Sequence, residues 1–559
     1  MVLEIFYYIT EKSESQMKTT ASVLASNFKH WGLNHIFGIP GKAVSPILFE
    51  LLHENIEFVL AKHEAAAGFE AAGYALMNQK IGVAIGTSGP GGTNLLTAAG
   101  QATASHLPVL IITGHPSMKD TGKALGQDSS TFGTDLVNMF QYVTKFSARV
   151  ERGDMLRPYL QHALEKAISG VNGPVHLSIP FDVLLEEIEP FVLDLPVLQH
   201  MVSPNLADVA DQLNAASRPL LFLGKGVHSS RAYEEVQRFA EHWGIPVVTT
   251  PGGKGAFPSN HSLSLGAFGL GGTPEATAYL QEKVDLLVII GSKMSDMSTA
   301  GLAESMYPEH VIHFDYDPTF IGKSINVPTT PVLGDIKTNL QLILKDLPDK
   351  KEIFMSAPEP LKLQENTPGE RMSAIQVLRA MRNSLPADAI VFGDDGSHSF
   401  YGIKHYDVYE PGTFYFEDIF GAMGNGIGYA IGAQLAVPEK TVVCLTGDGC
   451  MFMHGTEIST AYNYDAPVLF IVINNGRLDM VEKGMRKMIG TSIGGIYETP
   501  MKAACFAESM GLQGYTCRDP FELTKRITEA LKYTKETNKP IVLEVLVDEN
   551  EIPPTMGRQ

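Results

Sequence analysis

The sequence predicts an α/β protein built from three doubly wound, parallel-sheet domains. The chain has 559 residues, which is too many for one ordinary hydrophobic core. From Met17 onward, short apolar runs rich in β-branched residues alternate with longer helical patterns, as is typical of parallel sheets covered by helices. Connectors rich in proline and charge divide this alternation into three blocks of similar size.

The blocks follow one another along the chain. The first runs from HIFGIPG to GPVHLSIPFDV, the second from RPLLFLGKGV to TTPVLGD, and the third from AIVFGDDGS to PIVLEVLVD. An acidic connector follows the first block, and a connector rich in Lys, Glu and Pro follows the second. Residues 1–16 lack the basic start of a signal peptide, and we interpret them as an N-terminal tail with Met17 as an alternative start.

The composition is that of a soluble globular enzyme and narrows the choice of partners. The formal net charge of −19 argues against binding to nucleic acid or to an anionic membrane, since either requires a basic face. No apolar run reaches the roughly 20 residues that cross a bilayer. The four cysteines show no metal-ligand spacing and no disulfide framework, which indicates a reducing compartment. We therefore expect a cytoplasmic protein.

The stretch TGDGCMFMHG carries the strongest chemical signal. It follows the apolar run TVVCL, and the next apolar run, PVLFIV, ends in Asn474 and Asn475. Strands joined by a crossover helix are parallel, and neighbouring carboxyl ends lie about 4.8 Å apart at the edge where open sheets bind ligands. Asp448 of the GDG and the two asparagines are therefore expected to meet at this edge.

These residue types point to a metal bound together with a diphosphate. A carboxylate, an amide oxygen and a loop carbonyl are hard donors of the kind that Mg²⁺ or Ca²⁺ prefers when phosphate oxygens complete its shell. Gly447 and Gly449 would let the backbone approach the phosphates closely. The alternative is a turn with a helix-capping aspartate. It would be favoured for the GDG alone, and the matched asparagines argue against it.

GDG followed at this interval by two asparagines resembles the cofactor fingerprint of thiamine diphosphate enzymes. KHEAAAGFEAAGYA, TSGPGGTNLLTAAGQA and GAMGNGIGYAIGAQLA also look like segments of the acetohydroxyacid (acetolactate) synthase and pyruvate oxidase group. The resemblance extends over nearly the whole chain from Met17 to about Val547. It implies a pyrimidine-binding domain at residues 17–190, a central domain at 200–350 and a diphosphate-binding domain at 370–550.

By this resemblance, the third block carries most of the cofactor site. Asp448, Asn475 and the carbonyl of Arg477 match the metal ligands. Met423 resembles the bulky residue that bends the cofactor, and the Gly421 carbonyl would accept a hydrogen bond from the cofactor's amino group. The positions that match cofactor-binding residues are Gly396, Ser397, His398, Gly421, Met423, Gly447, Asp448, Gly449, Cys450 and Asn475.

Glu64 and Gln127 are the predicted catalytic residues. Glu64 follows the strand-like run FVLAKH and begins a helix among apolar neighbours, a placement that suits a tuned acid. The resemblance implies that Glu64 exchanges a proton with the pyrimidine ring of the cofactor. The alternative is a helix acid stabilised by the macrodipole. Gln127 matches a glutamine that borders the substrate pocket of the synthases, although the local sequence departs from theirs.

Two departures from the group concern the substrate and flavin. Gly484 falls where branched-chain synthases resemble one another in carrying a tryptophan that selects the second 2-oxo acid. With Met480 and Val481 it would line a roomier pocket, and a surface helix is the alternative. Some relatives bind FAD in the central domain, but GSKMSD lacks their arginine-bearing run. We therefore expect no tightly bound flavin and keep FAD as the alternative.

The resemblance implies an enzyme that uses thiamine diphosphate and Mg²⁺ to decarboxylate a 2-oxo acid and join the remainder to a carbonyl acceptor. A decarboxylase without ligation and a noncatalytic thiamine diphosphate-binding subunit are the alternatives. A dinucleotide-dependent dehydrogenase is weaker, because no strand is followed by G-x-G-x-x-G. The group builds each site between two chains, so we expect a homodimer or homotetramer.

Overall fold

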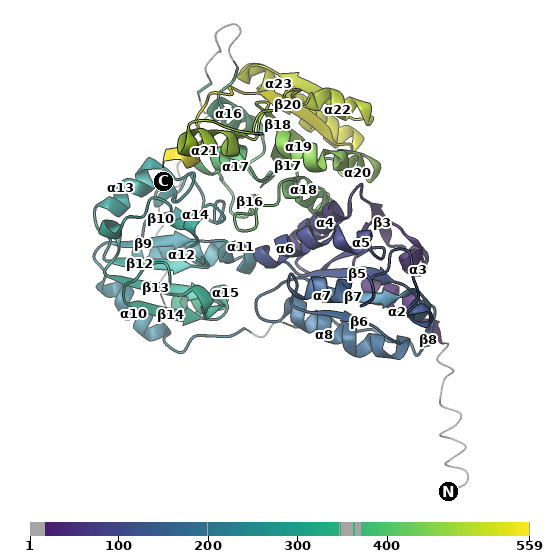
Figure 1. Ribbon diagram of the computed structural model, residues 1–559. Helices are drawn as coiled ribbons and strands as arrows, with labels where there is room; N and C mark the ends of the chain where they lie inside the picture. The colour runs from purple at the N-terminus through teal and green to yellow at the C-terminus, as the bar shows by residue number, and fades with distance from the viewer. Residues whose placement is uncertain (1–16, 198–199, 346, 348–361, 364–370, 558–559) are drawn as a thin grey trace. The chain divides into compact units, whose positions relative to one another are not determined.

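The computed structural model describes residues 17–197, 200–345, 347, 362–363 and 371–557. The chain divides into two compact units, Met1–Leu198 and Gln199–Gln559. Within the described residues, the first unit contains one six-stranded parallel sheet and the second contains two, which confirms the predicted fold class (Figure 1). The predicted tail and most of the connector before the third block lie outside the described residues.

The sheet of the first unit has the order β3-β2-β4-β5-β7-β6. Its strands are β2 (His35–Gly38), β3 (Glu57–Leu60), β4 (Gly82–Gly86), β5 (Val109–His115), β6 (Ser147–Arg149) and β7 (Val175–Pro180). Its helices are α2 (Thr20–His30), α3 (Ser45–His53), α4 (Glu64–Asn78), α5 (Pro90–Thr93), α6 (Leu96–Ser105), α7 (Leu136–Gln141), α8 (Leu156–Ile168) and α9 (Phe181–Leu184). Two short strands, β1 (Lys18–Thr19) and β8 (Glu187–Ile188), pair antiparallel outside this sheet.

The central sheet, in the second unit, has the order β11-β10-β9-β12-β13-β14. Its strands are β9 (Pro219–Leu223), β10 (Val247–Thr249), β11 (Ser264–Ala267), β12 (Leu286–Ile290), β13 (His310–Asp315) and β14 (Thr329–Leu333). Its helices are α10 (Leu206–Ala215), α11 (Gly226–Ser230), α12 (Tyr233–Trp243), α13 (Pro274–Gln281), α14 (Asp296–Thr299) and α15 (Ile336–Leu344).

The C-terminal sheet, also in the second unit, has the order β16-β15-β17-β18-β20-β19. Its strands are β15 (Ile390–Gly393), β16 (Phe414–Phe416), β17 (Val442–Gly447), β18 (Leu469–Asn474), β19 (Gln513–Cys517) and β20 (Ile541–Leu546). Its helices are α16 (Ala374–Ser384), α17 (Ser397–His405), α18 (Asn425–Ala436), α19 (Asp448–His454), α20 (Ile458–Asn463), α21 (Asp479–Ile489), α22 (Ala503–Ser509) and α23 (Pro520–Thr537).

The order of the strands distinguishes the central sheet from the other two. Numbered in chain order, the first-unit and C-terminal sheets both read 2-1-3-4-6-5, whereas the central sheet reads 3-2-1-4-5-6. The second order is that of the dinucleotide-binding fold. Similar sequence patterns along the three blocks therefore produce two topologies.

Apolar strands make a rigid base for the residues at the edge of the C-terminal sheet. Leu445, Ile471 and Leu543 lie side by side on β17, β18 and β20 and are at most 1% exposed. Burying each such side chain stabilises the fold by about 1.5–3 kcal/mol. The polar residues that follow these strands are thus held by a packed core.

Candidate active site

Three neighbouring strands of the C-terminal sheet end in polar residues. β15 runs into Asp394, β17 runs into Asp448, and β18 ends at Asn474. Because β15, β17 and β18 are adjacent and parallel, these residues lie at one edge. As expected from the sequence, Asp448 meets the loop after the asparagines, since its Oδ2 accepts a hydrogen bond from the Gly476 amide at 2.8 Å.

The Asp448 carboxylate is buried and is stabilised by backbone amides. Its Oδ1 accepts from the Gly449 amide at 2.9 Å, and the side chain stands between the loops after β17 and β18. Burial raises the pKa of Asp448 to about 6. A bound cation would favour the charged form of this carboxylate, so the position suits a metal ligand.

The two asparagines have different surroundings. Asn474 donates from Nδ2 to the Glu544 carboxylate at 2.6 Å and to the Met501 carbonyl at 2.8 Å, so its side chain holds the loop. The Asn474 Oδ1 also accepts from the Gly476 amide, so the whole Asn474 side-chain amide is used within the protein. Asn475 is half-buried, and of the two asparagines it is the one whose side chain could bind a ligand. Sequence analysis missed Glu544, although a charged residue inside the apolar run PIVLEVLVD is a signal that could have revealed it.

His398 stands between the glycine turns of β15 and β17. A Cβ on Gly396 would lie 2.6 Å from the His398 ring, and a Cβ on Gly447 would lie 2.9 Å from its Nδ1, so both turns require glycine. Burial lowers the pKa of His398 to about 4, which keeps the ring neutral. Among the described residues its buried Nε2 has no hydrogen-bond partner. The ring donates to the backbone of Asp394, so the single N–H of the neutral imidazole is already used and Nε2 is an acceptor. A phosphate placed beside Nε2 would favour the protonated ring, whose second N–H could then donate to a phosphate oxygen.

Ser397 and Cys450 are buried at the first turns of α17 and α19. The Cys450 thiol donates to the Asp395 carbonyl at 3.1 Å, and burial raises the pKa of this thiol well above its usual value. Its side chain thus joins two loops. Contact with a diphosphate at this position would use the backbone amide of Cys450.

Asp394, which the sequence analysis did not single out, ties the Gly421–Met423 loop to the sheet. Its Oδ1 accepts from the Gly424 amide at 2.8 Å, and its Oδ2 accepts from Thr446 Oγ1 at 2.9 Å. Met423 is half-buried, and a Cβ on Gly449 would lie 3.0 Å from its Cε. The structure therefore brings Met423 against the glycine that follows Asp448.

Asp395 is a second carboxyl group that the sequence analysis passed over. A Cβ on Gly421 would lie 3.6 Å from Asp395 Oδ2, so the carboxyl group faces the Gly421 turn. This Oδ2 is buried and has no hydrogen-bond partner among the described residues. Burial, together with the Asp394 and Asp418 carboxylates, raises the pKa of Asp395 to about 7. The pair of aspartates in GDDGS was the available signal.

Glu64 and Gln127 lie in the first unit. Glu64 begins α4, is 8% exposed, and accepts a hydrogen bond on Oε2 from Asn94 Nδ2 at 2.9 Å. Gln127 is exposed and has a φ of +53°. A Cβ on Gly89, in the loop after β4, would lie 3.0 Å from its Cα. The Gln127 backbone therefore packs against the glycine loop that precedes α5.

Comparison with known proteins identifies the family of the chain. Three family models of thiamine pyrophosphate enzymes match the chain: the N-terminal TPP binding domain at residues 18–141, the central domain at 206–343 and the C-terminal TPP binding domain at 394–545. A probable acetolactate synthase large subunit of Methanocaldococcus jannaschii is 31% identical, over 94% of this chain and 91% of the relative. The chain belongs to the family of thiamine pyrophosphate enzymes. It is also 30% identical to the acetolactate synthase isozyme 3 large subunit of Escherichia coli, over 96% of each chain.

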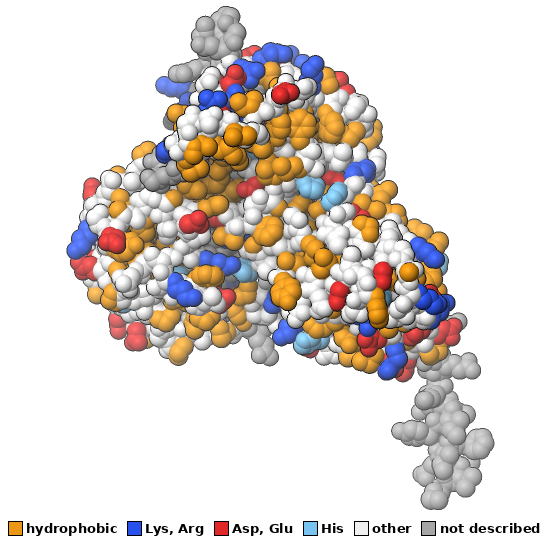
Figure 2. Space-filling model, in the orientation of Figure 1, with side chains coloured by type: hydrophobic (Ala, Val, Ile, Leu, Met, Phe, Trp, Pro, Cys, Tyr) orange, Lys and Arg blue, Asp and Glu red, His pale blue; other side chains and the backbone are white. Residues whose placement is uncertain are grey.

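Helix α21 of this thiamine pyrophosphate enzyme carries the three residues predicted to line the substrate pocket. Met480 is partly buried against the core of the C-terminal sheet, whereas Val481 is 47% exposed. Gly484 has room for a side chain, since the nearest atom to an added Cβ is Met556 Cε at 3.7 Å. Apolar side chains gather on the surface near α21 in Figure 2. The exposed ones on α21 and the loop after it are Val481, Met488, Ile489, Ile493 and Ile496.

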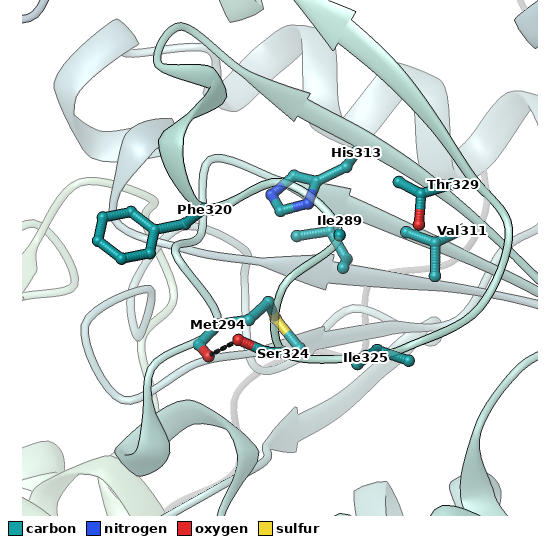
Figure 3. Close-up of a pocket in the computed structure, with 9 residues that line it drawn as sticks. Ile289, Met294, Val311, His313, Phe320, Ser324, Ile325 and Thr329 are labelled. Carbon is teal, nitrogen blue, oxygen red and sulfur yellow. Dashed lines mark hydrogen bonds between the residues drawn. The ribbon is translucent and has the colours of Figure 1, made fainter.

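A cavity elsewhere in the enzyme lies beside β12, β13 and β14 of the central sheet (Figure 3). Its lining is mostly apolar, and His313 there is bonded through Nε2 to the Ser292 carbonyl at 2.9 Å. None of the predicted site residues lines it. In the part of the chain that the structure describes, no helix is long and apolar enough to cross a membrane. No group of three or more His, Cys, Asp and Glu is placed to hold a metal within those same residues.

Proposed function

We propose that the enzyme decarboxylates a 2-oxo acid with thiamine diphosphate and Mg²⁺ and ligates the product to a carbonyl acceptor, as the names of the acetolactate synthase relatives suggest. The observation that carries this proposal is that the buried Asp448 carboxylate and the unpaired His398 nitrogen both lie at the edge shared by β15, β17 and β18. A single edge thus offers an anionic group for a cation and an imidazole nitrogen that a phosphate would protonate and bind.

The residues at this edge fit the cofactor and its metal. Mg²⁺ would be held by Asp448, Asn475 and the Arg477 carbonyl, which all offer oxygen donors. Burial raises the pKa of the Asp448 carboxyl group, and a bound cation would stabilise its charged form. The remaining positions would hold the diphosphate through backbone amides and the His398 ring. These positions are Gly396, Ser397, His398, Gly447, Gly449 and Cys450.

We assign Gly421 and Met423 of one chain, together with Glu64 of a second chain, to the pyrimidine half of the cofactor, because the family resemblance implies sites shared between two chains. Glu64 is supported as the acid by its burial and by the Asn94 hydrogen bond, which orients Oε2 and leaves Oε1 for a ring nitrogen. Glu64 would hold or release a proton at that nitrogen. When bound, thiamine diphosphate supplies the electron sink that allows CO₂ to leave a 2-oxo acid.

Substrate positioning is assigned to Gln127, Met480, Val481 and Gly484. The outcome depends on what takes up the donor fragment: a second carbonyl compound gives a 2-hydroxyketone or an acetohydroxyacid, and a proton gives an aldehyde. Ligation is favoured by similarity to acetolactate synthase large subunits. Decarboxylation without ligation is the second candidate. A noncatalytic subunit is disfavoured by the presence of both Glu64 and the metal set.

Bound flavin does not fit the central sheet. In a sheet of order 3-2-1-4-5-6, a dinucleotide lies at the carboxyl edge between the first and fourth strands, here β9 and β12. The turns after these strands touch, since the Gly226 amide donates to the Gly291 carbonyl at 2.8 Å. Side chains of the C-terminal half, Glu417 and Asp418, also cover this edge. We therefore propose an enzyme without FAD.

The domain limits, assembly and location follow the sequence analysis as proposals. We assign residues 17–190, 200–350 and 370–550 to the pyrimidine-binding, central and diphosphate-binding domains. We propose a homodimer or homotetramer, because the family resemblance implies sites shared between two chains. The cytoplasm is proposed from the four cysteines, which are unpaired in the structure.

A panel of 2-oxo acids tests the proposed function. The purified enzyme is incubated with thiamine diphosphate, Mg²⁺, one 2-oxo acid and a set of carbonyl acceptors, and both CO₂ and organic products are measured. CO₂ together with a ligated product supports ligation, and CO₂ with an aldehyde supports the second candidate. Release of no CO₂ from any donor, by an enzyme that binds the cofactor, would contradict both.

A further inference from the structure

The carboxyl edge of the central sheet is covered by a segment of the C-terminal half. The segment 408–418 lies along the loop after β10: the Ser259 amide donates to the Val408 carbonyl at 2.7 Å, and the Gly412 amide donates to the Gly255 carbonyl at 2.9 Å. It ends in two carboxylates, Glu417 and Asp418, which are 4% and 5% exposed.

Both carboxylates are held by residues of the central sheet's edge. Lys225, in the turn after β9, forms an ion pair with Glu417, and their side chains are 19% and 5% exposed. The Gly252 amide, in the loop after β10, donates to Asp418 Oδ2 at 3.1 Å. A Cβ on Gly252 would lie 2.6 Å from Asp418 Oδ1, so only glycine allows this approach. We name these four residues, Lys225, Gly252, Glu417 and Asp418, the acidic clamp.

The charged groups of the acidic clamp stabilise one another. Burial lowers the pKa of Lys225 to about 7 despite the neighbouring Asp418 carboxylate, so the ammonium ion depends on its acidic partners. Burial raises the pKa of Asp418, and Lys225 opposes this effect. Removing one member of such a buried set leaves the others as uncompensated charges.

The clamp stands at one end of the loop predicted to contact the cofactor. Residues 419–424 connect Asp418 to α18 and include Gly421 and Met423. At the other end of the loop, the Gly424 amide is held by Asp394 at 2.8 Å. The loop is therefore anchored to two different sheets, to the central sheet through the clamp and to β15 through Asp394.

We propose that the acidic clamp occupies the edge where a doubly wound sheet of this order would bind a dinucleotide, and that it positions loop 419–424 instead. Through this loop, Lys225 and Gly252 determine the affinity of the C-terminal site for thiamine diphosphate. This inference rests on the proposed function, because it takes Gly421 and Met423 as contacts of the cofactor. The clamp residues act through the loop, and none of them is among the positions assigned to the diphosphate half.

Calorimetry with two ligands tests the positioning role. Thiamine diphosphate and inorganic diphosphate, each with Mg²⁺, are titrated into wild type, Lys225→Met and Gly252→Ala. Both substitutions should weaken thiamine diphosphate binding by about 10- to 100-fold, because the cofactor would then have to order loop 419–424 as it binds. Diphosphate binding should change by less than about twofold, because its groups lie on the loops after β15 and β17. A general structural defect would weaken both ligands.

Lys283→Met is the matched control, since Lys283 forms an exposed ion pair with Glu309 in the same central domain. It should leave both affinities unchanged. Should Lys225→Met fail to fold, Gly252→Ala displaces Asp418 without burying an unpaired charge. Folded variants that bind thiamine diphosphate as tightly as wild type would overturn the inference alone. A wild type that binds no thiamine diphosphate would overturn the proposed function and this inference with it.

A flavin titration tests the other half of the proposal. Wild-type protein should show no flavin absorbance as purified and no saturable binding of FAD, because the clamp covers the edge where the dinucleotide would lie. Stoichiometric FAD would show that the edge is open and would overturn the inference.

Discussion

The carboxylate of Asp448 accepts a hydrogen bond at 2.8 Å from the backbone amide of Gly476, which belongs to the loop after the neighbouring strand. A single side chain thus joins the two loops that would enclose a metal. Burial raises the pKa of this carboxyl group to about 6, so the site lacks a positive charge that Mg²⁺ would supply.

Asp448→Ala should therefore abolish the Mg²⁺-dependent binding of thiamine diphosphate while the protein stays folded, because Asp448 lies at a strand end and outside the apolar core. Calorimetry measures binding, and circular dichroism measures the fold. Asp388→Ala is a suitable control, because this residue pairs with Lys440 on the surface. Unchanged affinity in the Asp448 variant would remove it from the metal site.

Glu64→Gln should lower turnover by about 10² or more, because glutamine keeps the shape and removes the proton that the acid exchanges. Steady-state assays with one 2-oxo acid measure the loss. Glu57→Gln, an exposed position on the strand that precedes Glu64, should behave as wild type. Wild-type turnover in the Glu64 variant would refute its role as the acid.

Asp395→Asn should make the cofactor-free protein more stable at pH 8 than wild type. The folded pKa of about 7 lies above the ordinary value of 3.8, so the folded protein retains a proton that the unfolded chain releases. Stability from this group is full below about pH 4 and is lost as the pH rises towards 7. A tenfold difference in acid dissociation constant between the folded and unfolded states corresponds to about 1.4 kcal/mol, so the variant should gain a few kcal/mol.

Urea unfolding between pH 4 and pH 8 checks this expectation. The gain should shrink as the pH falls and should vanish near pH 4, where both forms of the wild type hold the proton. A difference between variant and wild type that does not change with pH would show that Asp395 does not titrate in this range.

Gly484→Trp should restrict the acceptor more than the donor. The nearest atom to a new Cβ is Met556 Cε at 3.7 Å, so the side chain has room to enter the pocket that we assign to this face of α21. The ratio of ligated product to CO₂ should shift by about 10- to 200-fold for large acceptors. Ile489→Trp, at a position 64% exposed and about 140° around the same helix from Gly484, should leave the ratio unchanged. The same ratio for large and small acceptors would place Gly484 outside the pocket.

The features that could be predicted from the sequence are those that depend on residues close together in the chain. Alternating apolar runs and helical stretches predicted three parallel sheets, because strand and helix periods depend on nearby residues. The GDG and the two asparagines predicted a meeting of two loops, because parallel strands share a carboxyl edge. A partial glycine motif was not enough to predict that the central sheet has the 3-2-1-4-5-6 order.

By itself, then, the sequence determined the three-sheet fold class and the edge at which Asp448 meets the loop after Asn474. Only the tertiary structure decided how the polar residues around that edge are used. Asp394 holds the loop before α18, Asp395 keeps an unpaired oxygen, and Glu544 supports Asn474 from a neighbouring strand. The pairing of Lys225 with Glu417, 192 positions along the chain, was equally hidden. Such contacts join segments far apart in the chain. The partner of a carboxylate is decided by long-range packing, which the residues next to it in the sequence do not indicate.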